Sequence, residues 1–72
     1  MLSGKRFRLK APILGIETVG DHREPVQVPA DEIVVVLSGP RPDDRRLVDA
    51  RWDDKTLVMF VEDIEARGQE IR

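Results

Sequence analysis

The apolar positions of this chain fall in short runs that mostly alternate with polar positions, which is the pattern of half-buried β-strands. The first run is Lys5–Leu9, where Phe7 and Leu9 share one face and Arg6 and Arg8 share the other. Successive side chains of a strand point to opposite faces. This run therefore predicts a strand with an apolar inner face and a basic outer face.

Four further runs also predict strands. Glu32–Leu37 is rich in β-branched residues and is the clearest strand in the chain. Leu47–Trp52 alternates again, and Thr56–Val61 returns after a tight turn at Asp53-Asp54-Lys55. Gln69–Arg72 can form a last short strand.

The connections between these strands differ in length. Ile13–Val19 and Pro25–Val28 are the expected arms of a long irregular hairpin with a polar, glycine-bearing tip. Val28-Pro29-Ala30-Asp31 predicts a tight turn, because proline sets φ for the second turn position. Ser38–Asp44 ends the clearest strand and forms a loop. Glu62–Arg67 holds good helix formers and predicts one helical turn, which would end before a C′ glycine at position 68.

Five short strands in 72 residues favour a closed or nearly closed all-β barrel, because closure hides the strand edges. The length leaves room for one domain, residues 1–72, with one core. Trp52 and Phe60 are expected in that core.

The order of these elements resembles the SH3-like small β-barrel superfamily. Glu17–Pro25 would be the tip of its long first hairpin, Val28–Asp31 its diverging turn, Ser38–Arg46 its second loop and Asp53–Lys55 its distal hairpin. The segment Val28–Leu37 looks like bacterial members of this group. The chain also resembles small bacterial proteins of unknown function that end in a tryptophan, an acidic turn, a strand and an acidic helical turn. The resemblance implies a five-stranded SH3-like barrel with one short helical turn before the last strand.

The aromatic residues set this chain apart from the ligand-binding members of that group. Peptide-binding members hold a polyproline ligand on a platform of aromatics, and methyl-lysine readers need an aromatic cage. This chain has no tyrosine, and its three aromatics, Phe7, Trp52 and Phe60, lie on separate predicted strands. We therefore expect neither kind of ligand.

Composition and charge narrow the remaining classes. Hydrophobic residues make up 40% and charged residues of both signs 36%, which favours a folded chain over a disordered one. The absence of cysteine excludes disulfides and thiolate chemistry. The net charge is −2, whereas a dedicated duplex binder is usually basic.

No apolar run approaches the roughly 20 residues of a membrane helix, and none follows the basic start as in a secretory signal. We therefore expect a cytoplasmic protein without a membrane partner.

Patterns typical of catalysis or metal binding are sparse. His22 is the single histidine, and it is either a general base or pH switch, or a solvated loop residue. No serine or threonine lies in a recognisable nucleophile motif. The aspartates at positions 43, 44, 49, 53 and 54 could bind a hard cation, but Asp43-Asp44 and Asp53-Asp54 are more simply explained as turn residues. We expect a non-enzyme without a cofactor or metal.

Two sets of residues are candidates for binding. The first is a set of arginines that could hold a phosphate backbone or an acidic partner if they converge, or could pair with nearby aspartates if they do not. Its members are Arg6, Arg8, Arg41, Arg45, Arg46 and Arg51. The second is the run 57–61, which is apolar on both faces and is covered either by the long hairpin or by another chain. Its candidate interface residues are Leu57, Met59 and Val61.

Two functions follow from these sets. The favoured one is a non-catalytic protein-interaction or assembly module, which binds another protein or itself as a homo-oligomer. The alternative is a small-barrel protein that binds RNA or DNA through an arginine-lined face. Salt-sensitive nucleic-acid binding would separate the two.

Overall fold

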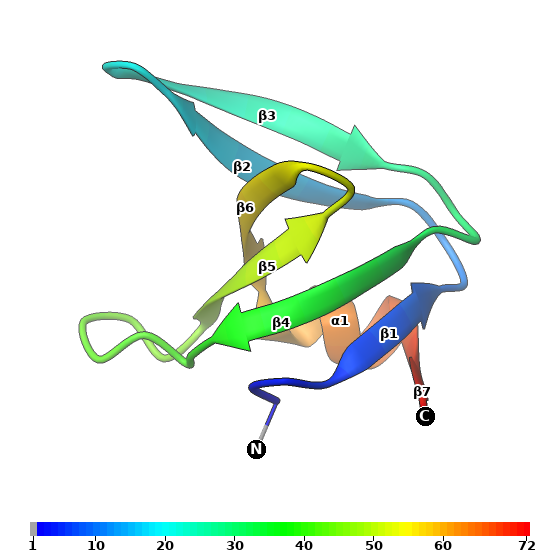
Figure 1. Ribbon diagram of the computed structural model, residues 1–72. Coiled ribbons are helices and arrows are strands. Elements are labelled where there is room, and N and C mark those ends of the chain that lie inside the picture. The colour runs from blue at the N-terminus through cyan, green and yellow to red at the C-terminus, as the bar shows by residue number, and fades with distance from the viewer. Residues whose placement is uncertain (1) are drawn as a thin grey trace.

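A computed structural model describes residues 2–72, which form seven strands and one short helix (Figure 1). In chain order the elements are β1 (Arg6–Leu9), β2 (Ile13–Val19), β3 (His22–Val28), β4 (Ile33–Ser38), β5 (Leu47–Trp52), β6 (Lys55–Phe60), α1 (Val61–Arg67) and β7 (Gly68–Ile71). All strands join one antiparallel sheet in the order β3-β2-β6-β5-β4-β1-β7.

The expected all-β fold is confirmed, but the closed five-stranded barrel is wrong, because the sheet is open and has seven strands. The difference lies in the long hairpin. Its arms pair along their whole length, from Ile13 with Val28 to Val19 with His22. The first arm also pairs with β6, where Ile16 lies opposite Val58. The hairpin therefore extends the sheet by two strands and leaves β3 and β7 as its outer strands.

The core lies between the inner face of the sheet and α1. The alternation predicted for Lys5–Leu9 and Leu47–Trp52 is confirmed, since Phe7, Leu9, Val48 and Ala50 are buried while their neighbours face outward or are only partly covered. α1 adds Ile64, which is fully buried. Burial of each large apolar side chain contributes about 1.5–3 kcal/mol. The other buried apolar residues of this core are Ile13, Val28, Val34, Val36, Leu57 and Met59.

The two aromatics expected in the core are placed differently. Trp52 is half-buried and packs against the core, while its Nε1 donates a hydrogen bond to Oε1 of Glu32 over 2.8 Å. Phe60 is 42% exposed, so its expected core position is wrong. Leu57 and Met59 occupy the inner face of β6, and strand alternation therefore turns Phe60 outward.

The helical turn before the last strand is confirmed as α1, which begins one residue earlier than expected. Gly68 is not the left-handed C′ residue that the sequence suggested, because its φ of −103° and ψ of 152° are extended. A Cβ at this position would lie 2.7 Å from the carbonyl oxygen of Ile64. Glycine is required here by a close backbone approach. No helix of residues 2–72 has the length and apolar character needed to cross a membrane.

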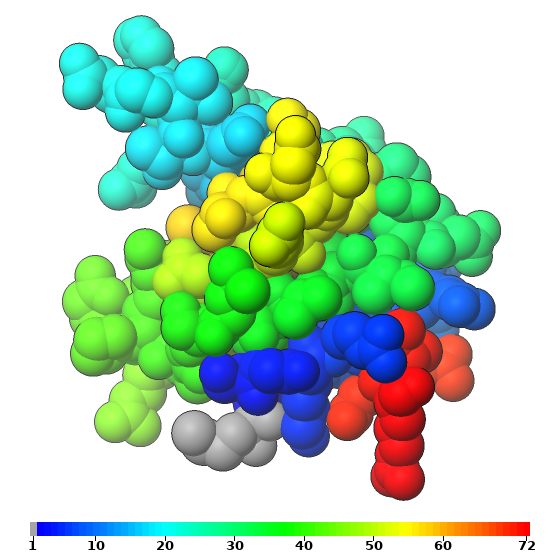
Figure 2. Space-filling view, viewed as in Figure 1, coloured from blue at the N-terminus to red at the C-terminus, as the bar shows by residue number. Residues whose placement is uncertain are grey.

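The two faces of the sheet differ in what covers them. α1 lies behind β4 and β1 in Figure 1, whereas the other side of these strands faces the viewer. Figure 2 shows this outer face, with β4 (green) running between β1 (blue) and the β5–β6 turn (yellow). The β2–β3 hairpin projects beyond it at one corner.

Candidate functional site

A groove lies between the β2–β3 hairpin and the loop of residues 39–46. Its larger part is an open cavity of about 450 Å³, lined by Arg23, Ser38, Gly39, Pro40, Arg41, Pro42, Asp43 and Asp49. Its smaller part, of about 80 Å³, is lined by Ile16, Thr18, Arg23, Arg41, Leu47 and Val58. Because Arg23 and Arg41 line both parts, the two cavities form one continuous feature, which we call the groove.

The floor of the groove is apolar. Ile16 of β2 lies opposite Val58 of β6, and Leu47 comes from the neighbouring strand β5. All three side chains are half-buried and lie on the outer face of the sheet, opposite the core. The inner positions of β6 are taken by Leu57 and Met59, so Val58 between them faces the groove.

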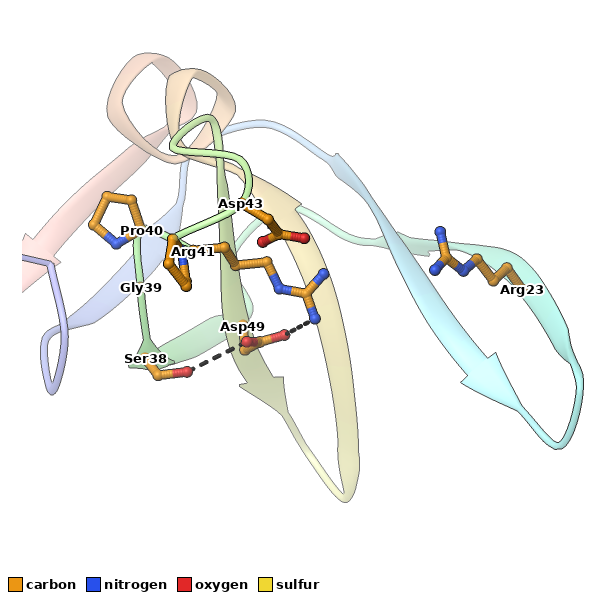
Figure 3. A pocket seen from close by; sticks show the side chains of 8 residues that line it. Arg23, Ser38, Gly39, Pro40, Arg41, Asp43 and Asp49 are labelled. Carbon is orange, nitrogen blue, oxygen red and sulfur yellow. Dashed lines mark hydrogen bonds and ion pairs between the residues drawn. The ribbon is translucent and has the colours of Figure 1, made fainter.

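The walls of the groove carry charge. Arg41 comes from the loop and Arg23 from β3, and their side chains extend into the space between these two segments (Figure 3). The Arg41 guanidinium lies 3.5 Å from Oδ1 of Asp49, and Oδ2 of the same carboxylate accepts a hydrogen bond from the Ser38 hydroxyl over 3.3 Å. None of the ion pairs among residues 2–72 involves Arg23.

The loop that forms one wall is held by Asp44 and Arg46. The Asp44 carboxylate accepts hydrogen bonds from the Arg46 backbone amide at 3.0 Å and from its guanidinium at 3.0 and 2.9 Å. The side-chain hydrogen bond from Arg46 lowers the pKa of Asp44 to about 2, and the same contact raises the pKa of Arg46. The Arg41 amide also donates to the Leu47 carbonyl over 2.9 Å. Arg46 is therefore engaged within its own loop.

A second feature is a cluster of arginines on the outer face of β1, β4 and β5. Arg6 lies opposite Val35 of β4, and Val35 lies opposite Arg51 of β5. Arg8 lies opposite Ile33 of β4. Residues paired across antiparallel strands share a face. We call the surface of Arg6, Arg8, Ile33, Val35 and Arg51 the arginine face.

The structure thus divides the six arginines expected to form one surface. Arg6, Arg8 and Arg51 meet on the arginine face, whereas Arg41, Arg45 and Arg46 lie in the loop 39–46. Sequence reasoning missed Arg23, which was assigned to a loop tip. The signal that could have found it is the alternation in β3, which puts Arg23 in register with Thr18 on the outer face.

The apolar interface expected at Leu57, Met59 and Val61 is not on the surface. Leu57 and Met59 are fully buried in the core of this chain, and Val61 is half-buried at the start of α1. The long hairpin and the chain's own core cover this side of β6. The exposed apolar residues of the outer face are instead Leu14, Ile33, Leu37 and Phe60.

The remaining candidates for chemistry are also placed. His22 is exposed at the start of β3, next to the hairpin turn. Asp44 and Asp49 pair with arginines, and Asp53 adopts a φ of 56° in the β5–β6 turn. Within the described part of the chain, no three histidine or acidic side chains gather closely enough to hold a metal ion.

Comparisons with protein-family models, with curated proteins and with solved structures find no match to this chain.

Proposed function

We propose that this chain is a non-catalytic protein-interaction module of SH3-like type that receives an extended peptide segment in the groove. The observation that carries the proposal is the combination of an apolar floor, formed by Ile16, Leu47 and Val58, with charged walls formed by Arg23 and Arg41. Binding pockets commonly pair apolar lining with a few polar groups that fix orientation.

The order of elements supports the SH3-like type. The chain runs through a strand, a long hairpin, a tight turn, a strand, a loop, a strand, a two-residue turn, a strand, a short helix and a final strand. This is the order on which the resemblance rests, with the arms of the hairpin counted as strands of their own. The open sheet is the departure from it.

The ligand proposed for the groove is not a polyproline segment. Such ligands dock on grooves lined by aromatics. No aromatic residue lines the groove. Phe7 is buried, the Trp52 indole is bonded to Glu32, and the exposed Phe60 lies opposite Leu47 at the border of the groove, outside its lining. An apolar side chain of another kind, with a polar group near Arg23, fits the lining better.

The lining residues suit binding more than proton transfer. A serine nucleophile needs an adjacent base. The Ser38 hydroxyl donates to Asp49, which is itself paired with Arg41, and His22 does not line the groove. This arrangement supports a non-catalytic role.

Peptide selection combined with NMR mapping tests the proposal. We expect peptides selected from a random display library on the wild-type chain to shift the amide signals of Ile16, Leu47 and Val58. Ile16→Glu should abolish their binding, because it puts a carboxylate on the apolar floor. Leu14→Glu is the matched control, since Leu14 lies on the same strand and face but is 56% exposed and outside the groove.

Two further readouts keep this test decisive. Ile16 is half-buried, so the amide spectrum of the free variant checks its fold, and Arg23→Glu provides a second groove variant at an exposed residue. Peptides that bind Ile16→Glu and Arg23→Glu as well as the wild type would contradict the proposal, as would a selection that enriches none.

Nucleic-acid binding, the other function expected from the sequence, has support only from Arg6, Arg8 and Arg51. Arg41 and Arg46 are engaged with aspartates, and the net charge is −2. We therefore make nucleic-acid binding an outcome of the experiment on the arginine face.

A further inference from the structure

The arginine face lies outside the groove and has a chemistry of its own. We propose that it binds an acidic, extended protein segment in which carboxylates at positions i and i+2 share one face with an apolar side chain at position i+4. The inference rests on the proposed function, because it takes the partner to be a protein, but it concerns a different surface.

The cross-strand rows that hold these three arginines contain no carboxylate. Arg6 and Arg51 belong to the cross-strand row Ile71–Arg6–Val35–Arg51–Thr56, and Arg8 to the row Gln69–Arg8–Ile33. Neither row holds a carboxylate. None of the ion pairs among residues 2–72 involves these three arginines.

Two of the neighbouring acids are engaged elsewhere. Asp49, which shares the outer face of β5, is paired with Arg41. Glu70 of β7 lies opposite Phe7, on the inner side, and pairs with Lys5 over 3.5 Å. Arg51 uses its Nε to donate to the Asp53 carbonyl over 3.1 Å, which leaves its terminal nitrogens for a partner. A chain with a net charge of −2 thus presents a local basic surface.

The spacing of these arginines matches that of carboxylates on one face of an extended chain. Arg6 and Arg8 are two residues apart on β1, so their Cα atoms lie about 7 Å apart. Carboxylates at positions i and i+2 of an extended partner segment have the same spacing of about 7 Å. Arg51 lies two strands away from Arg6, at about 10 Å, with Val35 between them. Guanidinium groups can hold carboxylates in a bidentate manner.

Apolar side chains of β4 lie among the arginines. Ile33 is 40% exposed, Leu37 of the same strand is 45% exposed, and Val35 is half-buried. Proteins that bind single-stranded nucleic acid stack bases on aromatic side chains. The two rows contain no aromatic residue, whereas arginine beside apolar groups is typical of protein interfaces. These residues therefore favour a protein segment over a nucleic acid.

Binding of three labelled probes to the full chain tests the inference by fluorescence anisotropy. The probes are a peptide with two glutamates and a leucine at successive alternate positions, so that all three share one face of an extended strand, the same peptide with lysine in place of glutamate, and an oligouridylate. We call the first two the glutamate–leucine and lysine–leucine peptides. We expect the glutamate–leucine peptide to bind most tightly, and its affinity to fall as salt is raised. Tighter binding of the lysine–leucine peptide would overturn the inference, and tighter binding of the oligouridylate would replace it with nucleic-acid recognition.

Arginine variants locate the site. Arg6→Gln and Arg51→Gln should each weaken binding of the glutamate–leucine peptide by about threefold to fivefold, in keeping with partly exposed ion pairs. Arg45→Gln is the matched control, because Arg45 is exposed in the loop 39–46, away from the face, and should bind like the wild type. Equal losses in all three variants would overturn the inference, since they would reflect net charge alone.

Two more variants separate the parts of the proposal. Ile33→Ser should weaken the glutamate–leucine peptide, and unchanged affinity would contradict the apolar contact. Ile16→Glu, in the groove, should leave binding at the arginine face intact. If the wild-type chain binds selected peptides in the groove but not the glutamate–leucine peptide, this inference is overturned and the proposed function stands. If it binds the glutamate–leucine peptide at the arginine face but no peptide in the groove, the proposed function is overturned.

Discussion

Asp44 and Arg46 show how a pair of exposed side chains can shape a binding surface. Their hydrogen bonds fold the loop 39–46 back on itself, and the Leu47 amide bonds to the Asp44 carbonyl over 3.1 Å. Short acidic side chains often bond to backbone amides a few residues on in turns. The pair therefore fixes the loop from which Arg41 reaches into the groove.

The Asp44–Arg46 pair should make the stability of the folded chain depend on pH. The folded-state pKa of Asp44 is about 2, below the ordinary aspartate value of 3.8. A depressed carboxyl pKa stabilises the folded chain fully above the unfolded-state pKa of about 4, and this contribution is lost as the pH falls through about 2. An NMR titration of the Asp44 carboxyl carbon measures the pKa directly.

Arg46→Gln is the control for this titration. Without the guanidinium, the Asp44 pKa should move back towards 3.8, and the stability that the pair contributes above about pH 4 should decrease. A wild-type Asp44 that titrates at the same pH as in Arg46→Gln would show that the hydrogen bonds do not form in solution.

Alternate residues of the strand β6 belong to the core and to the surface. Leu57 and Met59 are fully buried, while Phe60 is 42% exposed and Val58 lines the groove. The neighbouring strand β5 has the same arrangement, with Val48 and Ala50 inward. One strand thus contributes to the core with one face and to the binding surface with the other.

Two alanine substitutions test this orientation of β6. Leu57→Ala should destabilise the chain by about 2–5 kcal/mol, because it leaves a cavity in a packed core. Phe60→Ala should cost only about 1 kcal/mol, since much of that ring already meets water. Urea denaturation of both variants measures the difference, and a larger loss for Phe60→Ala would mean that the strand faces the other way.

The elements were predictable where polarity differs between the two faces of a strand. The sequence predicts Phe7 and Leu9 inward because they alternate with Arg6 and Arg8. The run Leu57–Val61 gave no such contrast, since all five residues are apolar, and only packing against β2 and α1 decides its orientation. The arms of the long hairpin were recognised as extended, but their pairing depends on contacts between residues up to 15 positions apart.

The candidate site was predictable only in part for the same reason. Alternation places Arg6 and Arg8 on one outer face, as expected. Their proximity to Arg51 depends on β4 lying between β1 and β5, and on the register at Val35, which no local pattern encodes. Arg23 and Arg41 face each other across the groove because the hairpin and the loop approach in space, which local sequence does not show.

At the scale of the whole molecule, the open sheet leaves β3 and β7 as outer strands. Exposed strand edges invite pairing with other chains. β7 has only four residues, whereas β3 has seven and carries Pro25.

The two-residue turn between Val19 and His22 fixes the register of the hairpin. In that register, alternate residues of β3 direct their backbone groups away from β2, and Pro25 is one of them. Proline has no amide hydrogen, so the middle of the exposed edge lacks a donor.

Pro25→Thr tests whether this proline keeps the chain from associating. The variant adds an amide donor and a β-branched residue to the edge, so we expect it to form dimers or larger species at concentrations where the wild type is monomeric. Gln27→Thr is the matched control, because Gln27 also faces the edge but already has an amide, and it should stay monomeric. Light scattering at low and high salt gives the mass of each. Association of Gln27→Thr to the same extent would assign the effect to β-propensity, and a wild-type dimer that persists at high salt would show that β3 is not the edge that matters.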